Sequence, residues 1–198
     1  GRSTTKYFAE ISTSLFVSIS AVLSILVFWN GIQNDSYGNY KIFEWISSGG
    51  FTANWSIKID PLSSIMLVVV TFVSALVHIY SIGYMSHDPH KPRFMSYLSL
   101  FTFSMLALVV SDNFLQLFFG WEGVGLCSYL LIGFWYKKET ANNAAIKAFI
   151  VNRIGDFGLA IAIFLIFFFF GTINFEETFQ ATSQFAEKKI IFFGFEAN

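Results

Sequence analysis

Four ionisable side chains lie inside long apolar runs, where a charge is costly. Glu122 is in the stretch Phe118–Gly125, and the next run contains Lys147, Arg153 and Asp156. Because a charge at the centre of a bilayer costs several kcal/mol to insert, such residues are functional candidates. Burial disfavours a charged carboxylate, whereas a neighbouring cation favours it. A carboxylate under both influences can gain or lose a proton when the cation moves, which is what a proton relay requires.

The spacing of these four groups indicates which of them can interact. Glu122 is about nine residues, or roughly 14 Å of helix, into its run, which places it near the midplane. Arg153 and Asp156 are three residues apart, so on a helix they share a face and can pair. Lys147 is about 9 Å nearer the helix end, and its side chain can instead reach the interface. A hydrogen-bonded structural Glu122 and a purely structural Arg153/Asp156 pair are the alternatives.

Three weaker patterns also contain residues of chemical interest. His78 is in an earlier apolar run and is either a proton carrier or a packing residue, since imidazole titrates near neutrality. His87 and His90 flank Asp88-Pro89 without a third His or Cys, which argues against a metal site. The glycines at 120, 123 and 125 do not follow a strand, so they predict close helix packing rather than a dinucleotide-binding loop.

Composition indicates the elements that must position these residues. Of 198 residues, 55% are hydrophobic and only 13% are charged, against about 25% charged in soluble domains. The single Cys127 excludes an internal disulfide or a thiolate cluster, and a net charge of −1 without a basic cluster argues against nucleic-acid binding. Five segments are long enough to cross a bilayer: 8–30, 61–84, 93–111, 113–136 and 142–171.

Local signals predict how some of these segments begin. Asp60 precedes a proline and can cap the second segment, and Lys91 precedes a proline at the start of the third. Ser111-Asp112 is the expected cap of the fourth. The turn between the third and fourth segments is therefore very short, which makes these two helices antiparallel neighbours.

The sequence also predicts smaller elements outside the five spans. Residues 31–60 are polar and end in an alternating run from Trp55 to Asp60, which predicts a β-hairpin outside the membrane. Asn174–Glu177 offers a capping box for a short amphipathic surface helix, and the run from Ile190 predicts the start of a further, truncated helix. We therefore divide the chain into a first membrane helix, the hairpin region, a four-helix core with the relay residues, and the C-terminal region: 1–30, 31–60, 61–171 and 172–198.

Basic residues in the short loops favour one orientation. Six lie on one face of the predicted bundle and four on the other, which assigns the first face to the matrix or cytoplasmic side: Arg2, Lys6, Lys91, Arg93, Lys137 and Lys138, against Lys41, Lys58, Lys188 and Lys189.

Four stretches together closely resemble one known family. Ser86–Leu100, Asp112–Leu117, Gly120–Ile132 and Ala144–Asp156 are similar to chain 5 of NADH:ubiquinone oxidoreductase, respiratory complex I, in its mitochondrial form. The resemblance covers nearly the whole chain and is densest over residues 60–172. It implies an all-α polytopic, antiporter-like subunit at the far end of the membrane arm, which couples remote quinone reduction to proton translocation.

The resemblance also implies roles and partners. The family glutamate that matches Glu122 is paired with a lysine on a later broken helix, further lysines and histidines continue the channel, and Arg153 and Asp156 match a charged pair near that route. Because this chain resembles helices two to six of the family pattern, the partner lysine is expected in a separate or missing C-terminal part of chain 5. Other membrane-arm subunits and membrane lipids are the expected partners, and the expected location is the mitochondrial inner membrane.

As a subunit of a proton-translocating NADH:ubiquinone reductase, the chain is expected to do no redox chemistry and to hold no cofactor or metal. NADH, FMN, iron–sulfur clusters and ubiquinone are expected in other subunits. Two alternatives stay open: a subunit of a multi-subunit sodium/proton antiporter, and a structural membrane segment without its own proton path.

Overall fold

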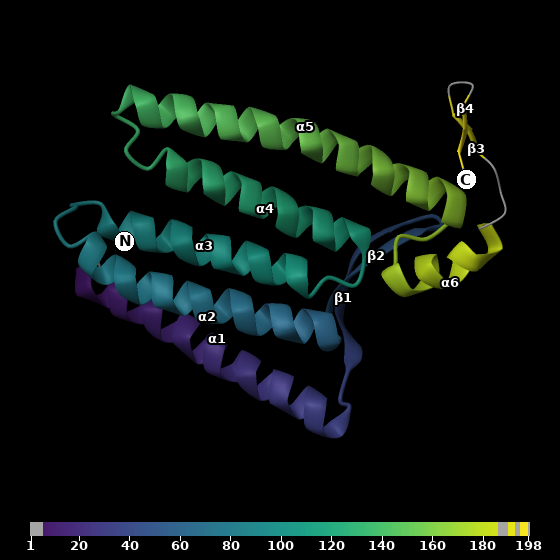
Figure 1. The fold of residues 1–198 in the computed structure, drawn as a ribbon, viewed down its shortest axis with the longest axis horizontal. Coiled ribbons are helices and arrows are strands. Elements are labelled where there is room, and N and C mark those ends of the chain that lie inside the picture. The colour runs from purple at the N-terminus through teal and green to yellow at the C-terminus, as the bar shows by residue number, and fades with distance from the viewer. Residues whose placement is uncertain (1–5, 186–189, 193–194, 198) are drawn as a thin grey trace.

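Five long helices lie next to one another in chain order in the computed structural model, which describes residues 6–185, 190–192 and 195–197 (Figure 1). All five are long and apolar enough to cross a membrane, which confirms the predicted spans. Neighbouring helices run in opposite directions (Figure 1); short connections join α2 to α5 in turn, whereas a longer connection with two strands joins α1 to α2. Their bounds are α1 Lys6–Asn34, α2 Pro61–Tyr84, α3 Lys91–Val109, α4 Phe114–Ile132 and α5 Glu139–Phe170.

Two helix starts differ from the predictions for identifiable reasons. Asn113, rather than Asp112, caps α4, because its Oδ1 accepts the backbone N–H of Gln116 at 2.9 Å. Helix α5 begins at Glu139, three residues earlier than predicted, since the Lys138 carbonyl already accepts the amide of Asn142. The predicted cap at Asp60 is confirmed, with its Oδ1 accepting the Ser63 N–H at 2.7 Å.

Glycine lets α3 and α4 approach closely, as the sequence predicts. A Cβ added to Gly120 would lie 2.6 Å from the backbone nitrogen of Leu108, and one added to Gly123 would lie 2.6 Å from Ser104 Oγ. At Gly120 the contact is with backbone, so the two helices can pack at this separation only with glycine there. At Gly123 the nearest atom belongs to a serine side chain, so an added Cβ would require Ser104 to shift.

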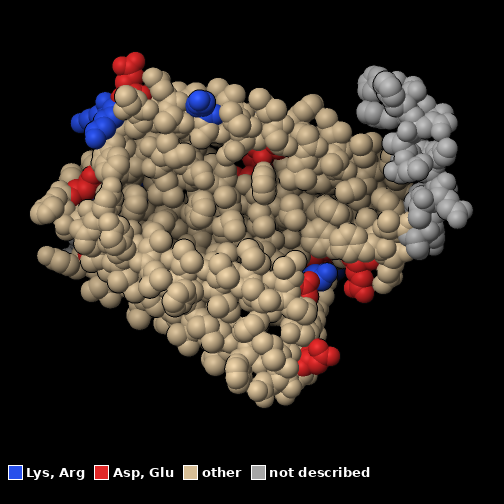
Figure 2. Space-filling model, viewed as in Figure 1, with Lys and Arg blue, Asp and Glu red and all other residues tan. Residues whose placement is uncertain are grey.

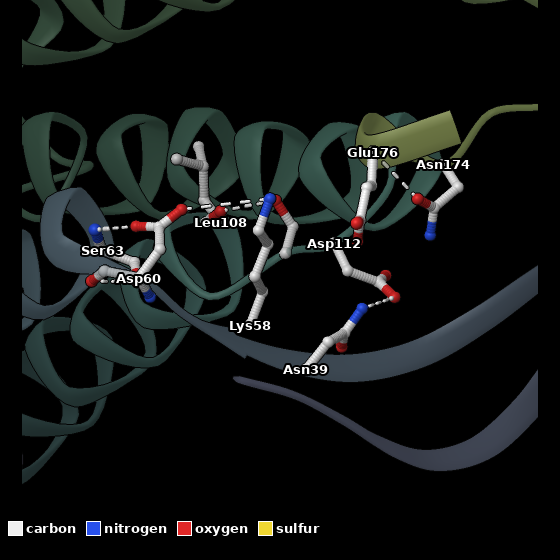
Figure 3. Close-up of polar contacts among 9 residues, drawn as sticks. Asn39, Lys58, Asp60, Ser63, Leu108, Asp112, Asn174 and Glu176 are labelled. Carbon is white, nitrogen blue, oxygen red and sulfur yellow. Dashed lines mark hydrogen bonds and ion pairs between the residues drawn. The ribbon is translucent and has the colours of Figure 1, made fainter. Parts of the chain in front are cut away.

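An antiparallel hairpin lies across one end of the helices and confirms the predicted extramembrane strands. Strands β1 (Gly38–Ser48) and β2 (Phe51–Ile59) pair with Phe43 opposite Trp55. Figure 3 shows the polar contacts that join this hairpin to the helix ends: Asn39 Nδ2 donates to Asp112 Oδ2 at 3.1 Å, and Lys58 pairs with Asp60 at 3.9 Å. The hairpin is therefore attached to the same end of the molecule where α2 and α4 begin.

A short helix follows α5 at this end, as predicted. Helix α6 spans Phe175–Phe185, and Asn174 Oδ1 accepts the amide of Glu176 at 3.0 Å (Figure 3). The expected return bond of the capping box is absent from the described contacts, because Glu177 instead accepts the Thr172 hydroxyl. The Phe175 amide donates to the Asp112 carbonyl at 3.0 Å, which holds α6 against the start of α4.

The prediction of a helix from Ile190 is wrong for the described residues. Two three-residue antiparallel strands occupy this region, β3 (Ile190–Phe192) and β4 (Phe195–Ala197). β-branched and aromatic residues favour strands, so the apolar run that suggested a membrane helix has an extended conformation instead.

Charged side chains are concentrated toward the two ends of the visible face, and a broad, almost uncharged band lies between them (Figure 2). This distribution suits helices that cross a hydrocarbon layer, since charges at the ends can stay hydrated. The few charges within the band are therefore the ones that need a physical explanation.

Candidate functional site

Arg153 joins two carboxylates at the middle of α4 and α5. Its Nη1 lies 2.6 Å from Oε1 and 2.5 Å from Oε2 of Glu122, across the helix interface. The same nitrogen lies 3.6 Å from Oδ2 of Asp156, one turn further along α5. The predicted Arg153/Asp156 pair is therefore present, but the shorter contact is with Glu122, and sequence spacing alone could not indicate that contact.

Asp156 has a second partner on α4. The indole nitrogen of Trp121 donates to Asp156 Oδ1 at 2.9 Å, so a continuous network links Trp121, Asp156, Arg153 and Glu122. The Asp156 side chain is only 7% exposed, whereas the side chains of Glu122 and Arg153 are 24% and 50% exposed. Asp156 is thus the buried anchor of the network, whereas the side chain of Arg153 is half exposed.

A pocket of about 380 Å³ opens beside the Glu122–Arg153 pair and is also lined by Ser104, Cys127 and Phe149. The guanidinium of Arg153 lies 4.9 Å from the centre of the Phe149 ring, within cation–π distance. The guanidinium of Arg153 thus contacts Glu122 and Phe149 at the same time, and the pocket leaves space beside it.

This arrangement defines what each group can do. A guanidinium is always protonated and only donates hydrogen bonds, so Arg153 cannot carry a proton in transit. It can pair with both Glu122 and Asp156 through Nη1. The groups of the network that could carry a proton are therefore the two carboxylates.

Lys147 and His78 lie apart from this network. Lys147 is exposed on α5, and none of the hydrogen bonds or ion pairs between described residues includes it. His78 is fully buried between α2 and α3, where Nδ1 contacts the Ser74 carbonyl at 2.8 Å and Nε2 contacts Ser99 Oγ at 3.1 Å. The Ser74 carbonyl accepts only, so Nδ1 of His78 donates to it. The Ser99 hydroxyl also donates to the Met95 carbonyl at 2.9 Å, so its single proton has two acceptors within reach. The structure thus brings together three of the five predicted site residues.

Sequence reasoning overlooked three polar residues. Trp121 directly precedes Glu122, and an indole N–H within an apolar helix needs an acceptor, which was an available signal. Glu10 is an acidic residue inside the first predicted span, and its Oε2 lies 2.7 Å from Lys91 Nζ with both side chains at most 8% exposed. Gln116 is completely buried and bonds to the backbone of β2. Each is a polar residue within a predicted span, and in none of the three does the local sequence identify the partner.

The described residues contain no group of three or more His, Cys, Asp or Glu side chains that could hold a metal ion.

Comparison with known proteins assigns the chain to a family. Residues 45–95 match the family model described as NADH-Ubiquinone oxidoreductase (complex I), chain 5 N-terminus, and residues 111–196 match the model NADH:quinone oxidoreductase/Mrp antiporter, TM. NADH-quinone oxidoreductase subunit L of Rickettsia bellii is 52% identical over 96% of this chain and 30% of its own length. NADH-ubiquinone oxidoreductase chain 5 of Triticum aestivum is 56% identical over 87% of this chain and 26% of its own. The chain belongs to the complex I chain 5/subunit L family.

The chain spans less than a third of the length of the chain 5 and subunit L relatives named above. Its fold is shared more widely. It is similar to a chain in the structure of the Mrp complex from Dietzia sp., with a TM-score of 0.69, 23% identity and coverage of 88% of this chain and 21% of that chain. A chain of an archaeal membrane-bound sulfane sulfur reductase has a TM-score of 0.62 at 17% identity, with coverage of 89% and 28%. At these identities the likeness is one of fold, and it confirms the antiporter-like helical architecture.

Proposed function

We propose that this chain forms part of the antiporter-like subunit of complex I and that Glu122, Arg153 and Asp156 form a proton-relay station within it. The observation that carries the proposal is the contact of Arg153 Nη1 with both oxygens of Glu122, at the middle of α4 and α5. Family membership supports the link to NADH-driven proton translocation, because the relatives are named as subunits of NADH-quinone oxidoreductase.

In this proposal the station alternates between two states. With Arg153 in contact, Glu122 is charged and holds no proton. When Arg153 leaves Glu122 for another part of the adjoining pocket, or when a cation from another part of the assembly replaces it, the charge next to Glu122 changes and a proton is taken up or released. Asp156 retains Arg153 near the site in both states, since it is held in place by Trp121. Lys147 and His78 are proposed as more remote relay positions.

We also propose which other components surround this chain. Other membrane-arm subunits and a further C-terminal part of chain 5 with the partner lysine would surround this chain in the mitochondrial inner membrane, together with lipids. NADH, FMN, iron–sulfur clusters and ubiquinone would belong to other subunits. Chains with flavin and iron–sulfur motifs in the purified assembly would distinguish this proposal from a sodium/proton antiporter.

The test is the Glu122→Gln variant of the intact assembly, reconstituted in vesicles. The amide keeps the size and hydrogen bonding of the side chain but cannot titrate, so fewer protons should be moved per NADH oxidised. Glu139→Gln is the matched control, because Glu139 is an exposed carboxylate at the first turn of α5. An unchanged proton-to-electron ratio in Glu122→Gln, with normal assembly, would refute the relay role and favour a structural segment.

A further inference from the structure

A second pocket lies at the opposite end of the helices from the hairpin, about where α3 begins and α4 ends. Its volume is about 490 Å³, and its wall combines Arg93, three tyrosines (Tyr97, Tyr129 and Tyr136) and Asn142 with the apolar side chain of Ile146. None of these residues belongs to the Glu122 network. The pocket is therefore separate from the proposed relay station.

The guanidinium of Arg93 does not use all of its hydrogen-bond donors in this pocket. One Nη2 hydrogen bond to the Phe134 carbonyl, at 3.1 Å, fixes the guanidinium, which also lies 4.7 Å from the Phe134 ring and 5.3 Å from the Tyr136 ring. Its Nε is buried and has no hydrogen-bond partner within the part of the chain that the structure describes. None of the ion pairs between described residues includes Arg93. A positioned guanidinium thus retains an unused donor and has no carboxylate in ion-pair contact among the described residues, although Asp88 lies near enough to interact with its charge.

The surroundings indicate what kind of anion fits. Arg93 is the only cation among the residues that line the pocket. Lys137 and Lys138 are in the adjoining loop but do not line it, and they lie on the face predicted to be the matrix or cytoplasmic side. Tyrosines are typical of the membrane–water boundary, where lipid headgroups lie. The apolar wall at Ala145 and Ile146 continues from this boundary along α5. A ligand with an anionic head and an apolar tail would match both parts of the pocket.

We propose that this pocket binds the phosphate group of an anionic phospholipid, with Arg93 as the principal contact. The planar guanidinium suits phosphate because two parallel N–H groups can meet two phosphate oxygens. Basic pockets between membrane helices on this side of a bilayer are suitable for anionic headgroups. The lipid tail would lie along the Ile146 side of α5, and the occupied pocket would hold the end of α4 against the start of α5.

The experiment uses the intact assembly in phosphatidylcholine vesicles that contain increasing amounts of a photoactivatable phosphatidylglycerol. After illumination, mass spectrometry quantifies labelling of the peptides that contain Tyr97 and Tyr136. In Arg93→Gln, the lipid fraction that gives half-maximal labelling should rise about tenfold or more, which is the expected effect of losing a charge-assisted hydrogen bond. Arg93→Lys, which keeps the charge without the planar donors, should have an intermediate effect.

Lys138→Gln is the matched control, since it removes a neighbouring cation whose Nζ lies 5.3 Å from the Trp135 ring. It should change labelling less than twofold, and an unchanged rate of NADH oxidation would show that each variant assembles. Equal losses in Arg93→Gln and Lys138→Gln would overturn the proposal in favour of general surface charge. Wild-type labelling in Arg93→Gln would also overturn it. Displacement of the lipid by millimolar inorganic phosphate would assign the pocket to free phosphate instead.

Discussion

Replacement of Gln116 by leucine tests how the hairpin is held on the helices. The Ser56 amide donates to Gln116 Oε1 at 3.0 Å, and Gln116 Nε2 donates to the Ser56 carbonyl at 2.8 Å. Gln116 is completely buried and Ser56 is 1% exposed. Leucine has a similar volume and fills the same space, so the substitution removes both partners of the Ser56 backbone without opening a large cavity.

The magnitude follows from these two bonds. A buried backbone group left without a partner costs about 1–3 kcal/mol, so two such groups cost about 2–6 kcal/mol. Burial of the more apolar leucine offsets about 1–2 kcal/mol of this. The net loss in the free energy of local opening should be about 1–4 kcal/mol, which corresponds to roughly 5- to 700-fold faster amide exchange at β2.

The assay is hydrogen–deuterium exchange of the β2 amides in the intact assembly, read by mass spectrometry. Ser56→Ala is one control: the Ser56 hydroxyl is buried without a partner among the described residues, so its removal should be neutral or slightly stabilising. Gln33→Leu, an exposed change at the end of α1, is the other. If Gln116→Leu exchanges no faster than these controls, the two backbone bonds do not hold the hairpin, and the reasoning fails.

Three further predictions follow from other contacts. Gly120→Val should force α3 and α4 apart and lower the melting temperature, because even a Cβ would lie 2.6 Å from the Leu108 backbone nitrogen. Gly155→Val is the control and should leave the melting temperature unchanged, since a Cβ at that position meets nothing within 4 Å. Equal effects of the two variants would contradict close packing of α3 and α4. Glu10→Gln should lower the free energy of unfolding by about 3–5 kcal/mol, because it leaves the buried Lys91 ammonium unpaired. In a double-mutant cycle, adding Lys91→Met should restore part of this loss. Additive effects of the two substitutions would argue against a buried ion pair. The N–H groups of His90 and Trp135 hold the pKa of Asp88 below its ordinary value of 3.8, so the resulting stabilisation is complete above that value and is lost as the pH falls through the lower folded pKa. Asp88→Asn should therefore abolish acid-induced opening of the loop between α2 and α3, as measured by amide exchange. Persistence of that opening would assign it to another group.

Much of the helical architecture could be predicted because membrane helices have strong local signals. Hydropathy over about 20 residues locates each span without knowledge of its neighbours. Asp60 could be identified as a cap for the same reason, since its partner Ser63 is three residues away. Predictions were weaker where a cap or a short strand depended on one or two residues, as at Asn113 and at Ile190.

The proposed site shows the limit of this local reasoning. Depth along the chain identified Glu122, Arg153 and Asp156 as candidates, and helical spacing indicated one of their two ion pairs. The sequence contained no indication that Arg153 would meet Glu122, 31 residues away, or that Trp121 would donate to Asp156. Glu10 was missed because its partner Lys91 is on another helix, although an acidic residue within a span was a sufficient reason to look for one.

By itself, the sequence determined which segments cross the membrane, which charges lie deep in it, and which glycines permit close packing. These properties are local, because each helix satisfies its own backbone hydrogen bonds and the cost of burying a charge depends on depth. The tertiary structure alone decided that Arg153 contacts both carboxylates, that Gln116 holds the hairpin, and that Arg93 faces a pocket with a donor unused. These contacts depend on the rotation and axial position of each helix relative to its neighbours, which are set by side-chain packing between segments distant in the chain.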